Sequence, residues 1–360
     1  MGDIATIQSG GTPARSIAEY WEDGTIPWVK ISDIKSKHLN QTEEMITEAG
    51  LENSSAKIFP KGTILYTIFA TLGETSILDI NAATNQAIAG ISITDSRVLP
   101  DYLYYYLLSQ KIHVQKIGRG VAQNNINMKL LRDFDVPLPS KEAQLNIIEQ
   151  LNRVTELLFL RKQQLTKLDE LIKARFVELT ENVNTVPTRM GDIATYINGY
   201  AFKPTDWKES GLPIIRIQNL NDATARYNYF DGKIDSKYLV TTGDILVSWA
   251  THLEAYIWNG NRAWLNQHIF KVLFNKIPIN KIYFVYATED ALRQAFKNAH
   301  GFKPTMEHIK RSDFENAIVK LPPMEIQNQF ADFVAEVDKS KLLAELFAQN
   351  ACILAENRSK

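Results

Sequence analysis

The hydrophobic positions of the chain predict two long helices. In the first, from about Ser140 to Asn182, apolar residues recur at every seventh position, and neither Gly nor Pro interrupts the stretch. Gln, Glu, Lys and Arg fill most other positions, and these residues favour helix. At a rise of about 1.5 Å per residue, the helix would be roughly 60 Å long. Its expected seam consists of Leu151, Leu158, Leu165, Ile172 and Leu179.

The second helical pattern runs from about Pro323 to Glu356. Its expected seam consists of Phe330, Val337, Ala344, Phe347 and Ala351. Because this seam includes small residues, it would let the backbone of a partner helix approach closely. We therefore expect the two helices to pair with each other as an antiparallel coiled coil. The alternative is that each helix pairs with a helix of another molecule.

Each long helix follows a segment with the same order of shorter elements. Short β-type runs punctuated by Gly and Pro come first, and a helix, a loop, a short helix and an extended Leu-Pro segment follow. In the first half the expected elements are strands at Ile4–Gln8, Trp28–Ile31, Ile64–Phe69 and Ala87–Ile93 and helices at Asp101–Lys116 and Met128–Arg132. In the second half the expected helices are Asn280–Asn298 and Met306–Arg311.

This common order reflects an internal repeat. The hexapeptide MGDIAT occurs at Met1–Thr6 and again at Met190–Thr195. Four further pairs follow in the same order: IPWVKISDI and LPIIRIQNL, KGTILYT and TGDILVS, TNQAIAGI and LNQHIFKV, and VPLPSKEAQ and VKLPPMEIQ. Five ordered matches at a nearly constant offset predict a tandem duplication.

Composition narrows the class of protein. The 360 residues carry a net charge of −1 and one cysteine, Cys352, so an internal disulfide is impossible and a reducing compartment is expected. With no signal peptide or membrane-spanning run in the sequence, we expect a cytoplasmic protein. Residues 1–139 have a charge of −3 (12 basic minus 15 acidic) and residues 183–322 have +4 (17 minus 13). A surface that binds nucleic acid must therefore be local, at least in the first half.

Several enzyme signatures are absent from the sequence. It has no GxxxxGK[ST] phosphate loop, no HExxH zinc helix and no cysteine pattern for a metal. Gly118 and Gly120 lack the spacing of a dinucleotide loop. The histidines are scattered, and no paired carboxylates suggest acid–base catalysis. We therefore expect no catalytic residue and no metal site, and the chain is typical of a binding protein.

The five duplicated motifs, in their fixed order, resemble the specificity subunit of type I restriction–modification systems over essentially the whole chain. The resemblance implies that each repeat is a target recognition domain followed by a spacer helix, and that each domain recognises one half of a bipartite, asymmetric site in double-stranded DNA. It implies no catalytic activity and no cofactor for this chain. The expected partners are two methyltransferase subunits, which use S-adenosylmethionine, and, in the full complex, two restriction subunits, which use ATP and Mg.

The implied fold is α/β, more closely α+β. Two tandem recognition domains related by a pseudo-twofold axis are expected to be separated by the antiparallel two-helix coiled coil. The helices would set the spacing between half-sites and dock the methyltransferase subunits. We place the first domain at 1–139, its helix at 140–182, the second domain at 183–322 and its helix at 323–360. Relatives usually have a short extension before the MGDIAT motif, so we expect the family's circular repeat to be trimmed here.

The duplication also indicates which residues contact bases. A residue shared by both copies cannot distinguish two different half-sites, so Asn85, Gln86 and their counterparts Asn266 and Gln267 are better explained as structural. Base contacts are expected where the copies differ and where polar and basic residues cluster in loops. A solvated turn is the alternative for such loops, and a basic residue can contact phosphate alone. The candidates are Thr12, Arg15, Lys30, Ser32, Lys35, Arg119, Gln123, Asn124, Asn125, Asn127 and Lys129 in the first copy and Tyr200, Lys203, Arg216, Gln218, Asn219, His252, Lys303 and Thr305 in the second.

The sequence leaves three further interpretations open. The aromatic run Tyr102–Tyr106 could stack on bases, but its helical spacing favours the core. A stand-alone DNA methyltransferase is disfavoured, because Pro322 and Pro323 lack the flanking residues of a methyltransferase motif and no cofactor loop precedes them. A protein-only scaffold with peptide-binding repeats is the other alternative.

Overall fold

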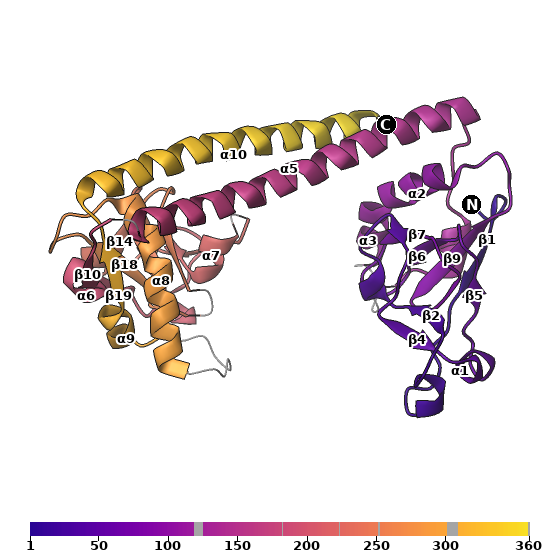
Figure 1. Cartoon of the computed structure of the whole chain (residues 1–360), viewed down its shortest axis with the longest axis horizontal. Coiled ribbons are helices and arrows are strands. Elements are labelled where there is room, and N and C mark those ends of the chain that lie inside the picture. Colours follow the sequence, from indigo (N-terminus) through magenta and orange to yellow (C-terminus); the bar gives the residue numbers. More distant parts are fainter. Residues whose placement is uncertain (119–124, 182, 223, 251–252, 301–308, 359–360) are drawn as a thin grey trace. The chain divides into compact units, whose positions relative to one another are not determined.

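The computed structural model of the chain describes residues 1–118, 125–181, 183–222, 224–250, 253–300 and 309–358. It divides into two compact units, one formed by Met1–Phe159 and Ala351–Lys360 and the other by Leu160–Asn350. Each unit contains a domain of mixed helices and strands (Figure 1). A long helix, α5 (Lys141–Glu181), begins in the first unit and ends in the second.

Two sheets form the body of the first domain. The strands are β1 (Ala5–Ser9), β2 (Ile26–Val29), β3 (His38–Leu39), β4 (Glu44–Ile46), β5 (Ile58–Phe59), β6 (Ile64–Thr67), β7 (Thr75–Leu78), β8 (Ala82–Thr84) and β9 (Ile88–Ile93). The larger sheet has the order β1-β9-β6-β7-β3 and the smaller β4-β2-β8-β5. The helices are α1 (Glu48–Glu52), α2 (Pro100–Ser109), α3 (Lys111–Gly118) and α4 (Met128–Arg132).

The central strands β6 and β7 of the larger sheet are buried on both faces. Along β6, Ile64 and Tyr66 pack in a cluster that includes the apolar face of α2. Leu65, which lies between them and points the opposite way, packs with Val29 and Phe59 of the smaller sheet. Because side chains alternate along a strand, a strand that is covered on both faces reads as a continuous apolar run. This explains why the segment beginning at Ile64 was recognisable in the sequence.

Among the described residues, the second domain repeats this topology without a counterpart of β3 and with an added pair of strands. Its strands are β10 (Val186–Arg189), β11 (Thr195–Asn198), β12 (Leu212–Ile215), β13 (Asn228–Phe230), β14 (Leu239–Val240), β15 (Ile245–Ser248), β16 (Glu254–Ile257), β17 (Ala263–Leu265), β18 (Ile269–Leu273) and β19 (Ile318–Leu321). Its helices are α6 (Met190–Ile193), α7 (Ile217–Asn221), α8 (Lys281–His300) and α9 (Arg311–Asn316). The sheets have the orders β11-β18-β15-β16 and β13-β12-β17-β14, and β10 pairs with β19.

Strand register confirms the tandem duplication. In the first domain β2 and β8 are parallel, with Trp28 opposite Ala83. In the second domain β12 and β17 are parallel, with Ile214 opposite Trp264. Trp28 and Ile214 occupy the same place in the duplicated motif, so the two copies share the register of this parallel pair.

Two sequence predictions of helices need correction. The helix expected at Asp101–Lys116 is two helices, because α2 ends at Ser109 and α3 begins at Lys111. The Ser109 hydroxyl donates a hydrogen bond to the Tyr106 carbonyl at 2.6 Å, a local contact that competes with the helical ladder. The short helix expected at Met306–Arg311 falls largely outside the described residues, and α9 begins only at Arg311.

The second long helix is α10 (Met324–Arg358), and within the second unit it runs antiparallel to α5. Phe176 of α5 packs edge-on against Phe330, with ring centroids 5.3 Å apart. Farther along α10, the Lys341 ammonium lies 2.6 Å from the Asp169 carboxylate. Contacts therefore move backwards along α5 as they move forwards along α10.

Part of the predicted seam lies at this contact, whereas Leu151 packs against the core of the first domain and Phe347 is exposed. Five of the seam residues are buried: Ile172, Leu179, Phe330, Val337 and Ala344. Leu151, Leu158 and Leu165 are half-buried, and the side chain of Ala351 is outside the described part. Phe347 is 59% exposed, and its ring lies 5.4 Å from the Arg161 guanidinium. Phe347 therefore lies at the rim of the helix pair, where a cation covers it, and not at the centre that its spacing suggested.

A buried glutamine joins each long helix to its domain. The Gln144 side chain is fully buried and accepts a hydrogen bond from the Leu99 amide at 3.0 Å, at the start of α2. Its own amide donates to the carbonyls of Arg97 and Pro139 at 2.9 and 3.0 Å. In the second domain Gln327 has the same role, because it accepts from the Asn280 amide at 3.0 Å at the start of α8. The Leu-Pro-x-x-Glu-x-Gln motif of the sequence is thus a joint between helix and domain.

Candidate nucleic-acid interface

The motifs that both copies share have structural roles. Asn85 accepts a hydrogen bond from the Ala87 amide at 3.1 Å and shapes the turn before β9. A Cβ atom at Gly10 would lie 2.0 Å from the Thr84 hydroxyl, and one at Gly199 would lie 2.1 Å from the Asn266 carbonyl. Only glycine permits these close approaches, so the shared residues hold each loop against its sheet. This agrees with the structural interpretation of the Asn-Gln pairs.

In the first domain, three candidate cations gather around two carboxylates that the sequence did not single out. Lys30 Nζ lies 2.9 Å from both the Glu43 and the Glu44 carboxylates. Arg15 forms an ion pair with the same Glu44. Lys35 lies farther from Glu43, at 3.6 Å, and its side chain is 72% exposed. The cluster therefore contains three positive and two negative charges.

Hydrogen bonding keeps this cluster ionised. The hydrogen bond from Arg15, followed by that from Lys30, lowers the pKa of the Glu44 carboxyl below its ordinary value. The hydrogen bond from Lys30 likewise lowers the pKa of Glu43. The same two carboxylates raise the pKa of Lys30. Near pH 7 these groups are therefore charged and neutralise one another in part.

The Arg15 guanidinium is also stacked on aromatic rings. It lies 3.6 Å from the ring centroid of Trp21 and 4.9 Å from that of Trp28. The two tryptophan rings meet edge to face, with centroids 5.0 Å apart. The stacking fixes the arginine over its own domain and leaves about half of its side chain exposed. Arg15 is thus a positioned cation at the protein surface.

The corresponding place in the second domain has a different partner. Arg216 occupies the motif position of Lys30, and its guanidinium donates a hydrogen bond to the side-chain oxygen Oδ1 of Asn228 at 3.1 Å. It lies 5.3 Å from the ring of Trp207. A neutral amide therefore faces this cation, where two carboxylates face Lys30.

Asn219 is not placed to contact a base. Its side chain is buried, with 6% of the residue exposed. It accepts from the Arg216 backbone amide at 3.1 Å and donates to the carbonyls of Ala225 and Arg226 at 3.2 and 3.3 Å. Asp33 bonds the Lys30 amide in the first domain in the same way, at 2.9 Å. Position 219 therefore fixes a turn, and this burial argues against the sequence prediction of a base contact.

The remaining candidates are dispersed over the two domains. Thr12 donates a hydrogen bond to the Gln86 side chain. Asn127 caps α4 by accepting from the Leu130 amide at 2.8 Å. Tyr200 packs in an aromatic cluster with Phe202 at 4.9 Å. Exposed polar side chains are found at Ser32, Lys129, Lys203 and Gln218, and Asn125 is half-buried and forms a bridge with Phe69. Arg119, Gln123, Asn124, His252, Lys303 and Thr305 lie outside the described residues.

Sequence reasoning missed the partners of the basic residues. Glu44 and Asn228 follow Lys30 and Arg216 by 14 and 12 positions in the chain. They face these residues because β4 pairs with β2, and β13 with β12, in antiparallel hairpins. The signal that could have found them is the pairing register of these strands, which the sequence pattern did not define.

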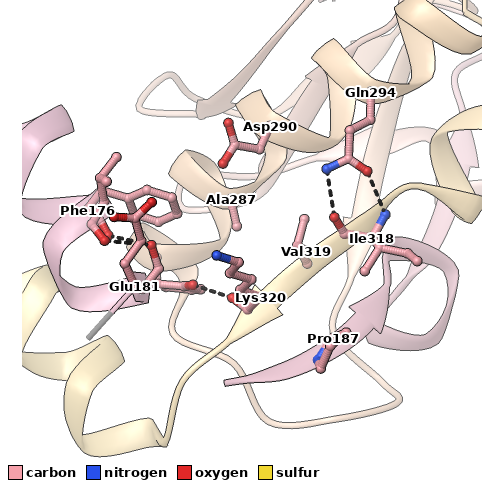
Figure 2. Close-up of a pocket in the computed structure, with 12 residues that line it drawn as sticks. Phe176, Glu181, Pro187, Ala287, Asp290, Gln294, Ile318, Val319 and Lys320 are labelled. Atoms are coloured by element: carbon pink, nitrogen blue, oxygen red, sulfur yellow. Dashed lines mark hydrogen bonds between the residues drawn. The ribbon is translucent and has the colours of Figure 1, made fainter. Parts of the chain in front are cut away.

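The second domain also contains a cavity of about 430 Å³ beside α5 (Figure 2). Apolar side chains such as Phe176 and Val319 line much of it. The Gln294 amide at its edge is bonded twice to the backbone of Ile318, at 2.8 and 3.1 Å. The lining offers mainly packing surface, and the Asp290 carboxylate in it is paired with Arg293.

The described residues also bear on metal binding and on membrane insertion. They contain no cluster of three or more His, Cys, Asp or Glu side chains placed to bind a metal ion. None of the helices within the described ranges is both long enough and apolar enough to cross a membrane.

Comparison with known proteins gives a consistent family. The family model described as "Type I restriction modification DNA specificity domain" matches residues 1–170 and again residues 182–348. The MjaIX specificity subunit of a type I restriction enzyme from Methanocaldococcus jannaschii is 26% identical over an aligned length of 375. The alignment covers 92% of this chain and 84% of that protein. The EcoBI specificity subunit of Escherichia coli is 28% identical over 166 residues, 44% of this chain and 34% of that protein.

A solved structure shares the fold. The chain resembles, with a TM-score of 0.61 and 17% identity, a protein whose structure was solved to explain complex assembly and conformational transition of the type I R-M system. The match covers 99% of this chain and 92% of that one. At this identity the likeness concerns the arrangement of the elements.

Proposed function

The chain belongs to the family of type I restriction modification DNA specificity domains and is a specificity subunit, and on this premise we propose that each of its two domains recognises one half of a bipartite DNA site. In both copies the smaller sheet has the same strand order, and its parallel pair has the same register. Their basic residues at the same motif position have different surroundings. One scaffold with two different polar surfaces is what recognition of two unlike half-sites requires.

The observation that carries this proposal is the pair Lys30 and Arg216. Each residue directly follows one strand of the parallel pair, Lys30 after β2 and Arg216 after β12. Both are oriented by a side-chain contact across a hairpin. Arginine and lysine side chains bind phosphate and the guanine edge, and an oriented cation loses less freedom on binding. We propose that these two residues contact DNA, together with Arg15 and Lys35 in the first domain and Gln218 in the second.

We propose further that the long helices dock the methyltransferase subunits. Four apolar residues on two successive turns of α10 are exposed within the second unit. They are Leu342, Leu343, Leu346 and Phe347, which are 56%, 58%, 46% and 59% exposed. Their spacing of one, four and five residues places them on one side of the helix. An apolar stripe of this kind in water is typical of a binding surface for another protein. On α5, Leu157 and Phe159 are exposed in the first unit at 51% and 59%.

The chemistry is assigned to the partners. In this proposal the chain itself is non-catalytic and binds no cofactor. The methyltransferase subunits use S-adenosylmethionine, and restriction subunits, where they join, use ATP and Mg. The specificity-subunit names of the relatives and the solved structure of a type I complex support an assembly of this kind.

The test is to map methylated adenines in the host genome with and without this chain. We expect one split recognition sequence that disappears when the chain is absent. Arg216→Ala should change the second half of that sequence alone, and Arg119→Ala the first half alone. Lys233→Ala, which removes an exposed lysine elsewhere in the second domain, is the matched control. A methylation pattern that is the same with and without the chain would contradict the proposal, and a complex without any sequence preference would favour a protein-only scaffold.

A further inference from the structure

Positions 44 and 228 are structurally equivalent. Glu44 lies opposite Trp28 in the β2–β4 hairpin, and Asn228 lies opposite Ile214 in the β12–β13 hairpin. The motif that aligns Trp28 with Ile214 also aligns Lys30 with Arg216. Each domain therefore presents the same pair of positions, a cation at the end of one strand and its facing residue on the neighbouring strand.

The facing residue differs in charge between the domains. Glu44 forms ion pairs with both Lys30 and Arg15, so one carboxylate is shared by two cations. The Glu44 side chain is 27% exposed, as is that of Lys30. Asn228 contributes the neutral oxygen of its side-chain amide, at 3.1 Å from the Arg216 guanidinium. An amide orients a cation without cancelling its charge.

A DNA phosphate must compete with whatever already neutralises a cation. Phosphate binding releases condensed counterions only to the extent that the protein adds net positive charge at the site. At Lys30 a phosphate would have to displace Glu44 and Glu43 or approach them closely. At Arg216 it meets no such opposition from Asn228, and the guanidinium keeps donors to spare beyond the one bonded to the amide.

We infer that the residue facing the basic position, Glu44 in the first domain and Asn228 in the second, determines how strongly each domain binds DNA phosphate. Glu44 weakens the binding of Lys30 and Arg15 to the phosphate backbone of DNA, so the first domain depends more on its other contacts. Asn228 leaves Arg216 available, so the second domain contributes more of the salt-dependent affinity. The inference rests on the proposed recognition of DNA and concerns how that recognition is divided between the domains.

The expected effect can be stated as a change in salt dependence. Each phosphate contact contributes about 0.9 to the slope of the logarithm of affinity against the logarithm of salt concentration. Between 50 and 200 mM salt, gain or loss of one contact therefore changes the ratio of affinities by about 3.5-fold. Glu44→Gln should make the slope steeper by about one contact, and Asn228→Asp should make it shallower by about one.

The experiment measures binding of the assembled complex to duplex DNA that carries its recognition sequence, at several salt concentrations. Glu52→Gln and Asn261→Asp are the matched controls, because each makes the same change of charge at an exposed residue of the same domain. Thermal unfolding of each complex verifies that the variants fold. A charge effect that acts at a distance would appear in the controls as well, whereas the inferred effect is confined to positions 44 and 228.

Opposite shifts of the slope for Glu44→Gln and Asn228→Asp, beyond those of their controls, would support the inference. Slopes that match the controls, while the unmodified complex binds its sequence normally, would overturn it and leave the proposed function intact. An unmodified complex that prefers no sequence would instead overturn the proposed function, and the inference with it.

Discussion

The buried glutamine at the start of each long helix allows a quantitative prediction. In Gln144→Leu the side chain keeps a similar volume but loses its hydrogen bonds to the Leu99 amide and to the carbonyls of Arg97 and Pro139. A hydrogen bond of this kind contributes about 1 kcal/mol net, and a buried donor that is left without a partner costs about as much or more. The free energy of unfolding of the first domain should therefore fall by about 3 kcal/mol.

The same reasoning ranks the two domains. Gln327 makes two hydrogen bonds of this kind, to the Asn280 amide at 3.0 Å and to the Pro322 carbonyl at 2.9 Å. Gln327→Leu should therefore cost about 2 kcal/mol, less than Gln144→Leu. The order of the two costs follows from the number of partners and not from burial, since both side chains are almost completely buried.

Urea unfolding of the full chain is the assay. With a urea dependence of about 3 kcal/mol per molar, the Gln144→Leu midpoint should fall by about 1 M. Gln163→Leu, at an exposed site on the same helix, is the control and should change stability by less than about 0.5 kcal/mol. If Gln144→Leu is no more destabilising than Gln163→Leu, the buried hydrogen bonds do not join the helix to the domain.

Three further predictions concern packing, assembly and pH. Gly10→Ala should destabilise the first domain strongly, because the new Cβ would lie 2.0 Å from the Thr84 hydroxyl, whereas Gly2→Ala, whose Cβ would lie 3.5 Å from Arg132, should be tolerated. Equal melting temperatures of the two variants in thermal unfolding would contradict this explanation. Leu343→Ser with Phe347→Ser should abolish co-purification with the methyltransferase subunits without lowering the melting temperature, whereas Glu345→Ser should leave both unchanged. Burial raises the pKa of Glu289 in the folded state, so ionisation of this group costs stability as pH rises above about 4.3, its unfolded value. Glu289→Gln should therefore stabilise the protein relative to the unmodified chain at pH 7 and lose that advantage at pH 4, and a gain that is the same at both pH values would exclude this cause.

The sequence predicted those parts of the fold that have a strong local signal. The heptad pattern indicated both long helices, and α5 and α10 lie where the apolar periodicity placed them. The repeated motifs indicated the duplication, and the strands β6 and β9 coincide with apolar runs that are buried on both faces. The two-residue strands β3 and β5 were missed, because two residues carry no periodicity, and they form only through pairing with neighbouring strands.

The candidate site was predictable in its residue types and not in its electrostatics. Motif comparison identified Lys30 and Arg216 as differing residues at one position. It could not show that Glu44 neutralises the former, because this contact depends on how the β2–β4 hairpin is registered. The burial of Asn219 was not foreseen for a related reason. An asparagine in a polar loop suggests a base contact, whereas here its amide satisfies three backbone groups of its own turn.

The hydrogen bonds of the glutamine joint are with main-chain atoms. The Gln144 side chain meets the amide of Leu99 and the carbonyls of Arg97 and Pro139, and Gln327 meets the amide of Asn280 and the carbonyl of Pro322. Every residue except proline supplies the same amide, and all residues supply the same carbonyl. Mutational drift in the surrounding loops therefore leaves the joint intact, so new target preferences can evolve while the attachment of each domain to its helix is inherited unchanged.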